Sequence, residues 1–237
     1  MMQPITAAPR LMARMAGGLW LLYVSIAGVA VFARGGLVVT GDAAATANNI
    51  LAHEPLYRLS FAADLLAIVC YIAMTALFYG LFKPVSRTIS LLAAFFGLVG
   101  CTIQVCGCVF EYTPLVVLKG AQHLSAFKAD ELQALAYMFL KLYSQAYSIA
   151  LVFFGFFGLL IGCLILKSTF LPRTLGVLMV IAGAAWLIFL SPPLGEQYLR
   201  PYLLAAGSGE GILILWLLVM GVNEQRWKEQ ARAAGGR

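Results

Sequence analysis

Long apolar runs separated by short polar segments dominate the chain. A transmembrane helix needs about 20 consecutive, mostly apolar residues. Six runs are long and apolar enough, namely 12–34, 57–82, 88–112, 133–166, 172–191 and 201–222. The pattern therefore predicts an all-α polytopic membrane protein, a six-transmembrane-helix bundle that forms a single transmembrane domain over residues 1–237.

One polar segment between the first two runs also has the features of a helix. Thr40 and Asp42 are capping residues, and Pro55 marks the place where a helix stops. We therefore expect a short helix at about 42–54, lying at the outer membrane interface. Asp130 and Glu131 stand where the N-terminus of a helix favours acids, so the fourth span begins there.

Composition supports a membrane location for most of the chain. Hydrophobic residues make up 62% of the 237 residues, charged residues only 11%, and the mean hydropathy is +0.91. A soluble domain is typically about half apolar and a quarter charged. A chain with so few charges does not have enough polar side chains to cover a surface that faces water.

The placement of the basic residues predicts the orientation of the spans and excludes nucleic acid as a partner. The net charge is +6, but the lysines and arginines stand at the ends of apolar runs rather than on one binding face. One side collects Arg10, Arg14, Lys83, Arg87, Lys167, Arg173, Arg226, Lys228, Arg232 and Arg237, and the other collects Arg34, Arg58, Lys119, Lys128 and Arg200. The positive-inside rule then places both termini in the cytoplasm, as an even number of spans requires.

Several polar side chains interrupt the apolar runs. Ionisable groups inside a membrane are costly and usually face the interior of a bundle or water. At a rise of about 1.5 Å per residue, Asp64 lies about 10 Å from the outer end of its span, Lys141 and Gln104 about 12 Å, and Glu210 about 14 Å. Glu111 lies nearer the outer mouth. Four spans thus place polar groups in one layer of the outer half of the membrane.

Helical spacing of three and four residues puts these polar groups on shared faces. In span two the stripe holds Ser60, Asp64, Tyr71 and Thr75, and in span four it holds Tyr137, Lys141, Ser144, Gln145 and Ser148. We therefore predict a polar chamber that opens outward above a mostly apolar floor. Its candidate ligand-binding residues are Asp64, Glu210, Lys141, Gln104, Glu111, Tyr71, Tyr137 and Gln145.

A purely structural role for these charges is the alternative. Buried charges often pair, so Lys141 would neutralise Asp64 or Glu210 and hold helices together. Three acids near one lysine still leave an acid without a counter-charge. That acid is either protonated or awaits a cation.

Catalytic and metal-binding patterns are weak in this chain. All five cysteines stand inside apolar runs, and the two histidines, His53 and His123, fall in outer loops. The stretch "HEPLY" (53–57) begins like a zinc-protease motif, but Pro55 interrupts it and Tyr57 replaces the second histidine. We therefore expect no catalytic residue, no metal ion and no cofactor.

Several stretches in order resemble the bacterial membrane family called domain of unknown function 4386. They are "GDAAATANNILAHEPLYRLSFAADLL", "LFKPVSRTISLLAAFFGLV", "LSAFKADELQALAYMFLKLYSQAYSIALVFFG", "FLPRTLGVLMVIAGAAWLI" and "GEGILILWLLVMGVNEQRW", between about Arg10 and Trp227. The resemblance implies a multi-pass protein of the bacterial inner membrane. It also places Asp64 and Glu210 in family-like motifs. Where the family often has a histidine in span four, this chain has Tyr143.

Three functions fit these observations. The first is a membrane-embedded binding protein or carrier that takes a small amphipathic or cationic ligand, or a lipid, into the chamber. The second is an accessory subunit of a membrane protein complex. The third is an intramembrane enzyme acting on a lipid-like substrate, with Asp64, Glu111 or Glu210 as general acid or base.

Overall fold

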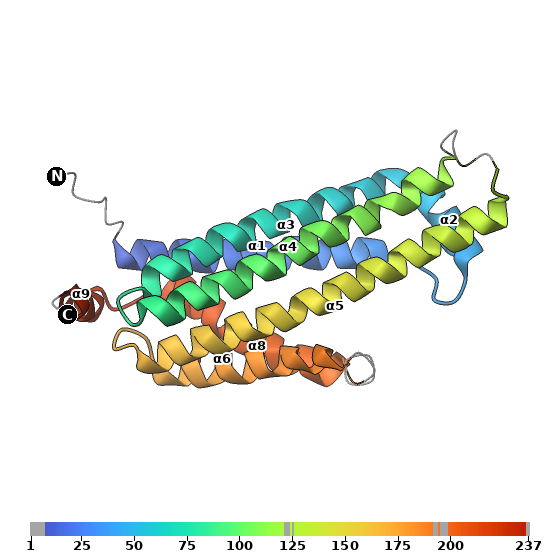
Figure 1. Ribbon diagram of the computed structural model, residues 1–237. Helices are drawn as coiled ribbons and strands as arrows, with labels where there is room; N and C mark the ends of the chain where they lie inside the picture. The colour runs from blue at the N-terminus through green and yellow to red at the C-terminus, as the bar shows by residue number, and fades with distance from the viewer. Residues whose placement is uncertain (1–7, 121–123, 125, 192–193, 195–198, 236–237) are drawn as a thin grey trace. The chain divides into compact units, whose positions relative to one another are not determined.

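The computed structural model describes residues 8–120, 124, 126–191, 194 and 199–235, and its regular elements there are all helical (Figure 1). They are α1 (Pro9–Gly35), α2 (Ala43–Ala52), α3 (Glu54–Phe82), α4 (Arg87–Leu118), α5 (Ala129–Lys167), α6 (Arg173–Trp186), the 3-10 helix η2 (Leu187–Leu190), α8 (Leu199–Val219) and α9 (Glu224–Gly235). The all-α class predicted from the sequence is confirmed.

Among the described residues, five helical segments are long and apolar enough to cross a membrane: α1, α3, α4, α5 and α6 with η2. The sixth predicted span corresponds to α8, which has 21 residues and is followed by α9 after a bend of 100°. The 39 residues of α5 extend over about 58 Å, well beyond the roughly 30 Å of a bilayer core. The chain is a multi-pass membrane protein with five to six spans.

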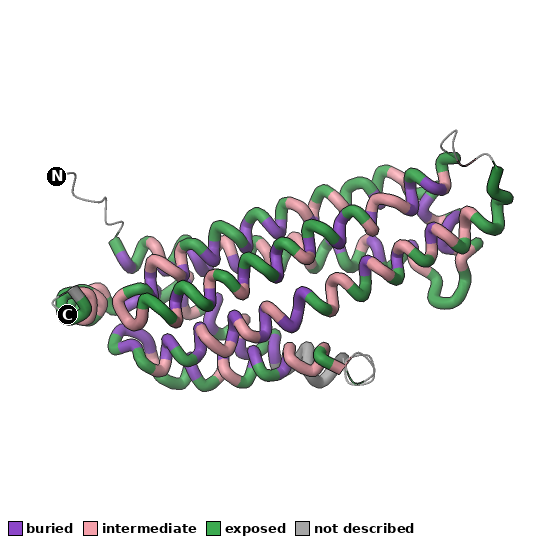
Figure 2. The backbone as a smooth tube through the Cα atoms, viewed as in Figure 1, coloured by how far each residue is buried: buried purple, intermediate pink, exposed green. Residues whose placement is uncertain are grey.

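The outer surface of the long helices is apolar, unlike that of a soluble protein. Figure 2 shows buried and exposed residues alternating along each long helix, so that each has a buried stripe and an exposed one. The exposed stripes carry large apolar side chains such as Leu66, Val69 and Val109, which are 55%, 61% and 64% exposed. Asp64 and Glu111 are buried instead. Apolar side chains on the outside are what a lipid environment requires.

The chain divides into two compact units. Unit 1 contains Met1–Leu21, Cys70–Cys101 and Ile149–Arg237, and unit 2 contains Leu22–Val69 and Thr102–Ser148. The helices α1, α3, α4 and α5 each contribute one part to each unit. The two units differ in what holds them together, and each is described by itself.

Unit 1 packs its helices closely through glycines. In Figure 1, α6 runs beside the C-terminal half of α5. A Cβ atom on Gly183 of α6 would lie 2.5 Å from the backbone nitrogen of Leu159 in α5, and one on Gly162 would lie 2.8 Å from that of Val180. On α8, a Cβ atom on Gly209 would lie 2.7 Å from the carbonyl oxygen of Leu178. Only glycine permits these approaches, a common device in membrane proteins.

An aromatic core completes unit 1. Trp20 meets Phe78 edge-on at 5.6 Å between ring centroids, and Phe78 stacks on Phe82 at 5.9 Å. Phe157 and Phe170 extend the cluster, and all five rings are at most 4% exposed. Offset and edge-on pairs of this kind add to the dispersion energy of tight packing.

Unit 2 has an apolar core beside α2. Leu37, Ile50, Tyr57, Leu115 and Leu140 form this core and are at most 7% exposed. Asp42 caps α2, because its Oδ1 accepts a hydrogen bond from the Ala45 nitrogen at 2.8 Å. Helix α2 ends at Ala52, and Pro55 lies in the first turn of α3, where a missing N–H costs nothing.

Candidate functional site

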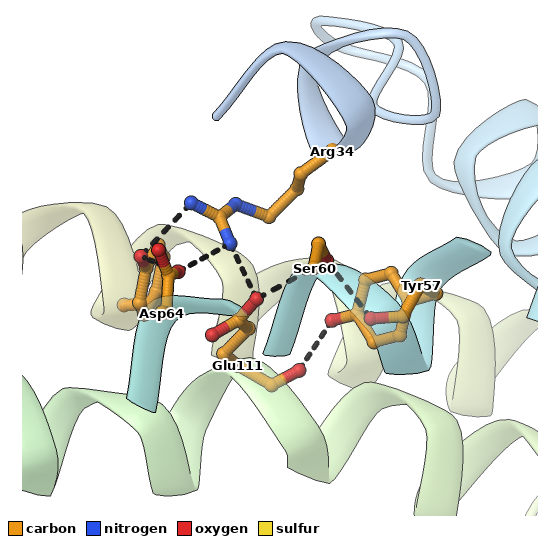
Figure 3. A network of polar contacts seen from close by, with 6 residues as sticks. Arg34, Tyr57, Ser60, Asp64 and Glu111 are labelled. Atoms are coloured by element: carbon orange, nitrogen blue, oxygen red, sulfur yellow. Dashed lines mark hydrogen bonds and ion pairs between the residues drawn. The ribbon is translucent and has the colours of Figure 1, made fainter. Parts of the chain in front are cut away.

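Four side chains from four helices meet in the interior of unit 2. We call Arg34, Asp64, Glu111 and Tyr143 the arginine cluster (Figure 3). Arg34 lies in the last turn of α1, Asp64 on α3, Glu111 on α4 and Tyr143 on α5. All four belong to unit 2, so the cluster is a feature of that unit alone.

The guanidinium group of Arg34 is the centre of the cluster. Its Nη1 donates to Asp64 Oδ2 at 2.8 Å and also to Glu111 Oε1, while its Nη2 donates to the Tyr143 hydroxyl at 2.9 Å. That hydroxyl in turn donates to Asp64 Oδ2 at 2.9 Å. Charge-assisted hydrogen bonds of this kind are roughly twice as strong as neutral ones. The guanidinium carbon also lies 4.6 Å from the centroid of the Tyr143 ring, a cation–π contact.

The cluster is buried and its charges do not balance. Arg34 is 8% exposed, Asp64 7% and Glu111 0%. One guanidinium faces two carboxylates, so the net charge is −1 when both acids are ionised. An uncompensated charge in a membrane interior is costly. A bound proton or a bound cation would remove it.

Glu111 is held from its backbone as well as from its side chain. The Tyr57 hydroxyl donates to the Glu111 carbonyl oxygen, and the Ser60 hydroxyl lies 3.5 Å from Glu111 Oε1 (Figure 3). The second carboxyl oxygen, Oε2, is buried and has no hydrogen-bond partner among the described residues. A buried carboxyl oxygen without a donor is the natural position for a proton.

Asp64 also lines a small cavity. It has a volume of about 10 Å³, room for about one water molecule, and is lined by Asp64, Gln104, Tyr23, Ala27, Ala67, Ile68 and Tyr147. Gln104 Oε1 is buried, and it has no hydrogen-bond partner in the part of the chain that the structure describes. Asp64 and Gln104, both predicted site residues, thus line the same water-sized space.

Arg34 and Tyr143 are the two residues of the cluster that are absent from the predicted site. The sequence pattern places Arg34 among the basic residues on the outer side, but α1 continues to Gly35 and Arg34 is buried. The cation beside Asp64 is therefore Arg34, and the interpretation of Lys141 as that cation was wrong. Lys141 is exposed, and its Nζ lies 5.5 Å from the centroid of the Tyr137 ring. The surplus of acids over cations inside the spans was the signal that a second cation was missing.

The other predicted site residues divide between the two units. In unit 2, the Tyr137 hydroxyl accepts from the Gly41 nitrogen at 2.8 Å, and Gln145 is exposed. In unit 1, Tyr71 is 4% exposed, and its ring lies 4.4 Å from the ring of Phe154. The ligand-binding roles of these residues stay predictions.

Glu210 belongs to unit 1 and has a neutral partner. The indole nitrogen of Trp186 donates to Glu210 Oε1 at 2.6 Å, where α8 packs against α6. A Cβ atom on Gly207, three residues before Glu210, or on Gly211, directly after it, would meet nothing within 4 Å. The single chamber that was predicted to join Asp64 and Glu210 stays a prediction.

Within the described residues, no group of three or more histidine, cysteine, aspartate or glutamate side chains is placed to hold a metal ion. His53 is exposed at the C-terminal end of α2, and its Nδ1 lies 3.1 Å from the Asn49 carbonyl oxygen. His123 and Arg237 lie outside the described residues.

Comparison with known proteins identifies a family. No curated protein and no solved structure matches the chain. Residues 15–221, most of the 237, match the family described as "Domain of unknown function (DUF4386)". The match includes all four residues of the arginine cluster, so the cluster lies within the family's domain. The chain belongs to the DUF4386 family.

Proposed function

We propose that the protein is a membrane-embedded binding protein or carrier for a small cation. The ligand is a proton, or a monovalent ion about the size of a water molecule, taken up by Asp64 and Glu111. The observation that carries the proposal is the charge of the arginine cluster, in which one buried guanidinium faces two buried carboxylates. Arg34 acts as a fixed counter-charge that keeps one carboxylate ionised, and the second carboxylate exchanges its proton or ion.

The size of the space favours a small ligand. The cavity beside Asp64 has room for about one water molecule. The amphipathic ligand considered from the sequence needs a pocket of several hundred cubic ångströms. Three pockets of about 590, 770 and 600 Å³ in the described part of the chain are lined by none of the candidate ligand-binding residues. A proton or a desolvated monovalent ion fits the available volume.

The hydrogen bonds of the cluster support a proton as the first choice. The Tyr143 hydroxyl both accepts from Arg34 and donates to Asp64, so it couples the guanidinium to the carboxylate. Glu111 Oε2 lacks a donor among the described residues. A proton on this oxygen would make the net charge of the cluster zero. It would need no space for an additional ion or water molecule. Aspartate and glutamate side chains inside the membrane commonly serve as proton relays in pumps and transporters.

We also propose that the chain lies in the cytoplasmic membrane of a bacterium with both termini in the cytoplasm. The excess of lysine and arginine on the side of the termini supports this orientation. Moving Arg34 from the outer loop to the interior lowers the number of basic residues outside and so strengthens the bias. The arginine cluster then lies toward the outer face.

Ion flux into vesicles tests the carrier. The purified protein is reconstituted into vesicles that contain a pH-sensitive dye, and a pH step is applied with and without potassium or sodium. Wild-type vesicles are expected to equilibrate faster than empty vesicles, and Glu111→Gln is expected to abolish the difference because glutamine cannot exchange a proton. Glu54→Gln, an acid-to-amide change on a partly exposed acid of the same unit that lies outside the arginine cluster, is the matched control and should behave like the wild type. Wild-type vesicles no faster than empty ones would rule out a carrier.

A further inference from the structure

The C-terminal helix α9 is attached to the end of unit 1 at a right angle to α8. The bend between the two helices is 100°. Because α8 occupies a predicted span, a helix at this angle lies along the membrane surface. Two side chains fasten it there. The Trp227 indole donates to the Leu81 carbonyl oxygen at 2.8 Å, and Gln230 Oε1 accepts from the Thr169 nitrogen at 3.1 Å and hydroxyl at 3.0 Å.

Three open clefts border α9, and a pair of arginines lines each of two of them. The first has a volume of about 590 Å³ and includes Arg10, Arg226 and Glu224 in its lining. The second has a volume of about 770 Å³ and includes Arg173, Arg226 and Glu229. Each of these two clefts therefore holds two guanidinium groups against one carboxylate, a net charge of +1. Arg226 lines both clefts.

The guanidinium groups are available to a ligand. Arg10, Arg173 and Arg226 are exposed, and none of them forms an ion pair with another described residue. Arg226 has one weak internal contact, from Nη1 to the Thr169 carbonyl oxygen at 3.4 Å. Its remaining donors face no internal acceptor among the described residues. Arginine forks of this kind bind phosphate with two parallel hydrogen bonds.

The first cleft also has an apolar wall. Phe170, Leu171, Trp216 and Met220 line it together with the arginines. Met220 is 54% exposed although it is a large apolar side chain. A cationic rim beside an apolar wall, at the level where a helix lies on the membrane, suits a molecule with an anionic head and a hydrocarbon tail.

We propose that these clefts bind the phosphate group of an anionic phospholipid, with Arg226 as the shared ligand and Arg10 and Arg173 as its partners on either side. The apolar wall receives the first part of the acyl chains. The site is in unit 1 and uses none of the residues of the arginine cluster. It is a second site, independent of the proposed cation site.

Lipid retention measures this binding directly. The full chain is purified in mild detergent, and phosphatidylglycerol or phosphatidylcholine is titrated in while native mass spectrometry counts the bound lipid. Phosphatidylglycerol should bind more tightly than phosphatidylcholine. The double variant Arg173→Gln/Arg226→Gln should lose about fivefold in affinity for each arginine removed. Arg232→Gln on the same helix, outside both clefts, is the matched control and should bind like the wild type.

A third variant and a competitor distinguish a lipid phosphate site from diffuse charge attraction and from a site for free phosphate. Arg226→Lys keeps the charge but loses the fork, so it should give an intermediate affinity, and it guards against misfolding of the double variant. An equal loss in Arg232→Gln and in the double variant would mean diffuse attraction and would overturn the proposal. Equal binding of both lipids would overturn it as well. Inorganic phosphate that displaces phosphatidylglycerol at comparable concentration would identify a free phosphate site and not a lipid site.

Discussion

The two units of this protein depend on different kinds of contact. In unit 1, α5, α6 and α8 approach one another through glycines, and aromatic rings fill the core. In unit 2, four helices are tied by the buried charges and hydroxyl group of the arginine cluster. Adding an atom at the glycines is expected to destabilise unit 1, because there is no room for it. Removing a charge from the arginine cluster is expected to destabilise unit 2, because its partners are buried. Helices that contribute to both units, such as α3 and α5, therefore use packing in one part and electrostatics in the other.

The largest expected effect comes from removing the charge at the centre of unit 2. Arg34→Met replaces the arginine with an unbranched apolar side chain, which resembles its aliphatic part. The change leaves Asp64 and Glu111 buried without their cation. Removing one partner of a buried ion pair typically costs about 3–5 kcal/mol. The free energy of unfolding in detergent, measured with a chemical denaturant, should fall by this amount. Arg58→Met changes the same residue type in an exposed pair of unit 2, and a loss of equal size there would contradict the comparison.

The matching change in unit 1 adds one carbon where there is no room. Gly183→Ala would place a Cβ atom 2.5 Å from the Leu159 nitrogen, so the α5–α6 contact must open. Overpacking of this kind typically costs about 1–3 kcal/mol. The same unfolding measurement applies. Gly211→Ala, in the same unit but with open space around the new atom, is the control, and a similar loss in both variants would mean that close packing is not the cause.

Tyr143→Phe removes one hydroxyl from the cluster and leaves its ring in place. The variant loses the hydrogen bond from Arg34 and the one to Asp64. Leaving buried charged groups with one partner fewer should cost about 1–3 kcal/mol. Tyr137→Phe breaks only a bond to the Gly41 nitrogen near the surface, and its smaller loss of stability is the reference. Equal losses would show that the hydroxyl of Tyr143 has no special role.

The smallest effect on the free energy of unfolding is expected at Glu210, the acid of unit 1 that lies inside a predicted span. Glu210→Gln keeps an oxygen that accepts from the Trp186 indole. Because its partner is neutral, the free energy of unfolding should change by less than about 1 kcal/mol. Asp64→Asn makes the equivalent change beside a guanidinium and should cost clearly more. A larger loss of unfolding free energy in Glu210→Gln than in Asp64→Asn would contradict the view that buried charge matters more in unit 2 than in unit 1.

The spans and part of the candidate site could be predicted from the sequence, and both predictions depend on the cost of polar groups in lipid. A run of apolar residues has one stable conformation in lipid, a helix, and an acid inside such a run is too costly to be accidental. Asp64 and Glu111 could be found in this way, and Gln104 as a neutral polar side chain in the same layer. Arg34 could not, because a charged residue just before two glycines has the same pattern as the start of a loop.

Other features depend on contacts that a linear pattern does not contain. Tyr143 is one aromatic residue among many in an apolar run, and its role is visible only once α1 and α3 bring Arg34 and Asp64 beside it. The partner of Glu210 is an indole 24 residues away. The sequence placed Lys141 on a polar stripe, but the side chain is exposed. Periodicity predicts which residues share a face, and it does not predict which face points inward.

Infrared spectroscopy of the carboxyl groups tests the central proposal most directly. A protonated carboxyl group has a C=O stretching band that a carboxylate lacks. In Glu210→Gln protein in lipid, which lacks the carboxyl group beside Trp186, and without added sodium or potassium, we predict such a band at neutral pH, lost when Glu111→Gln is added and kept when Glu54→Gln is added. If the ligand is sodium or potassium, adding that ion should displace the proton and remove the same band. A spectrum with no protonated carboxyl group, or a band that survives both Glu111→Gln and Asp64→Asn, would contradict a cluster that binds the extra proton or cation.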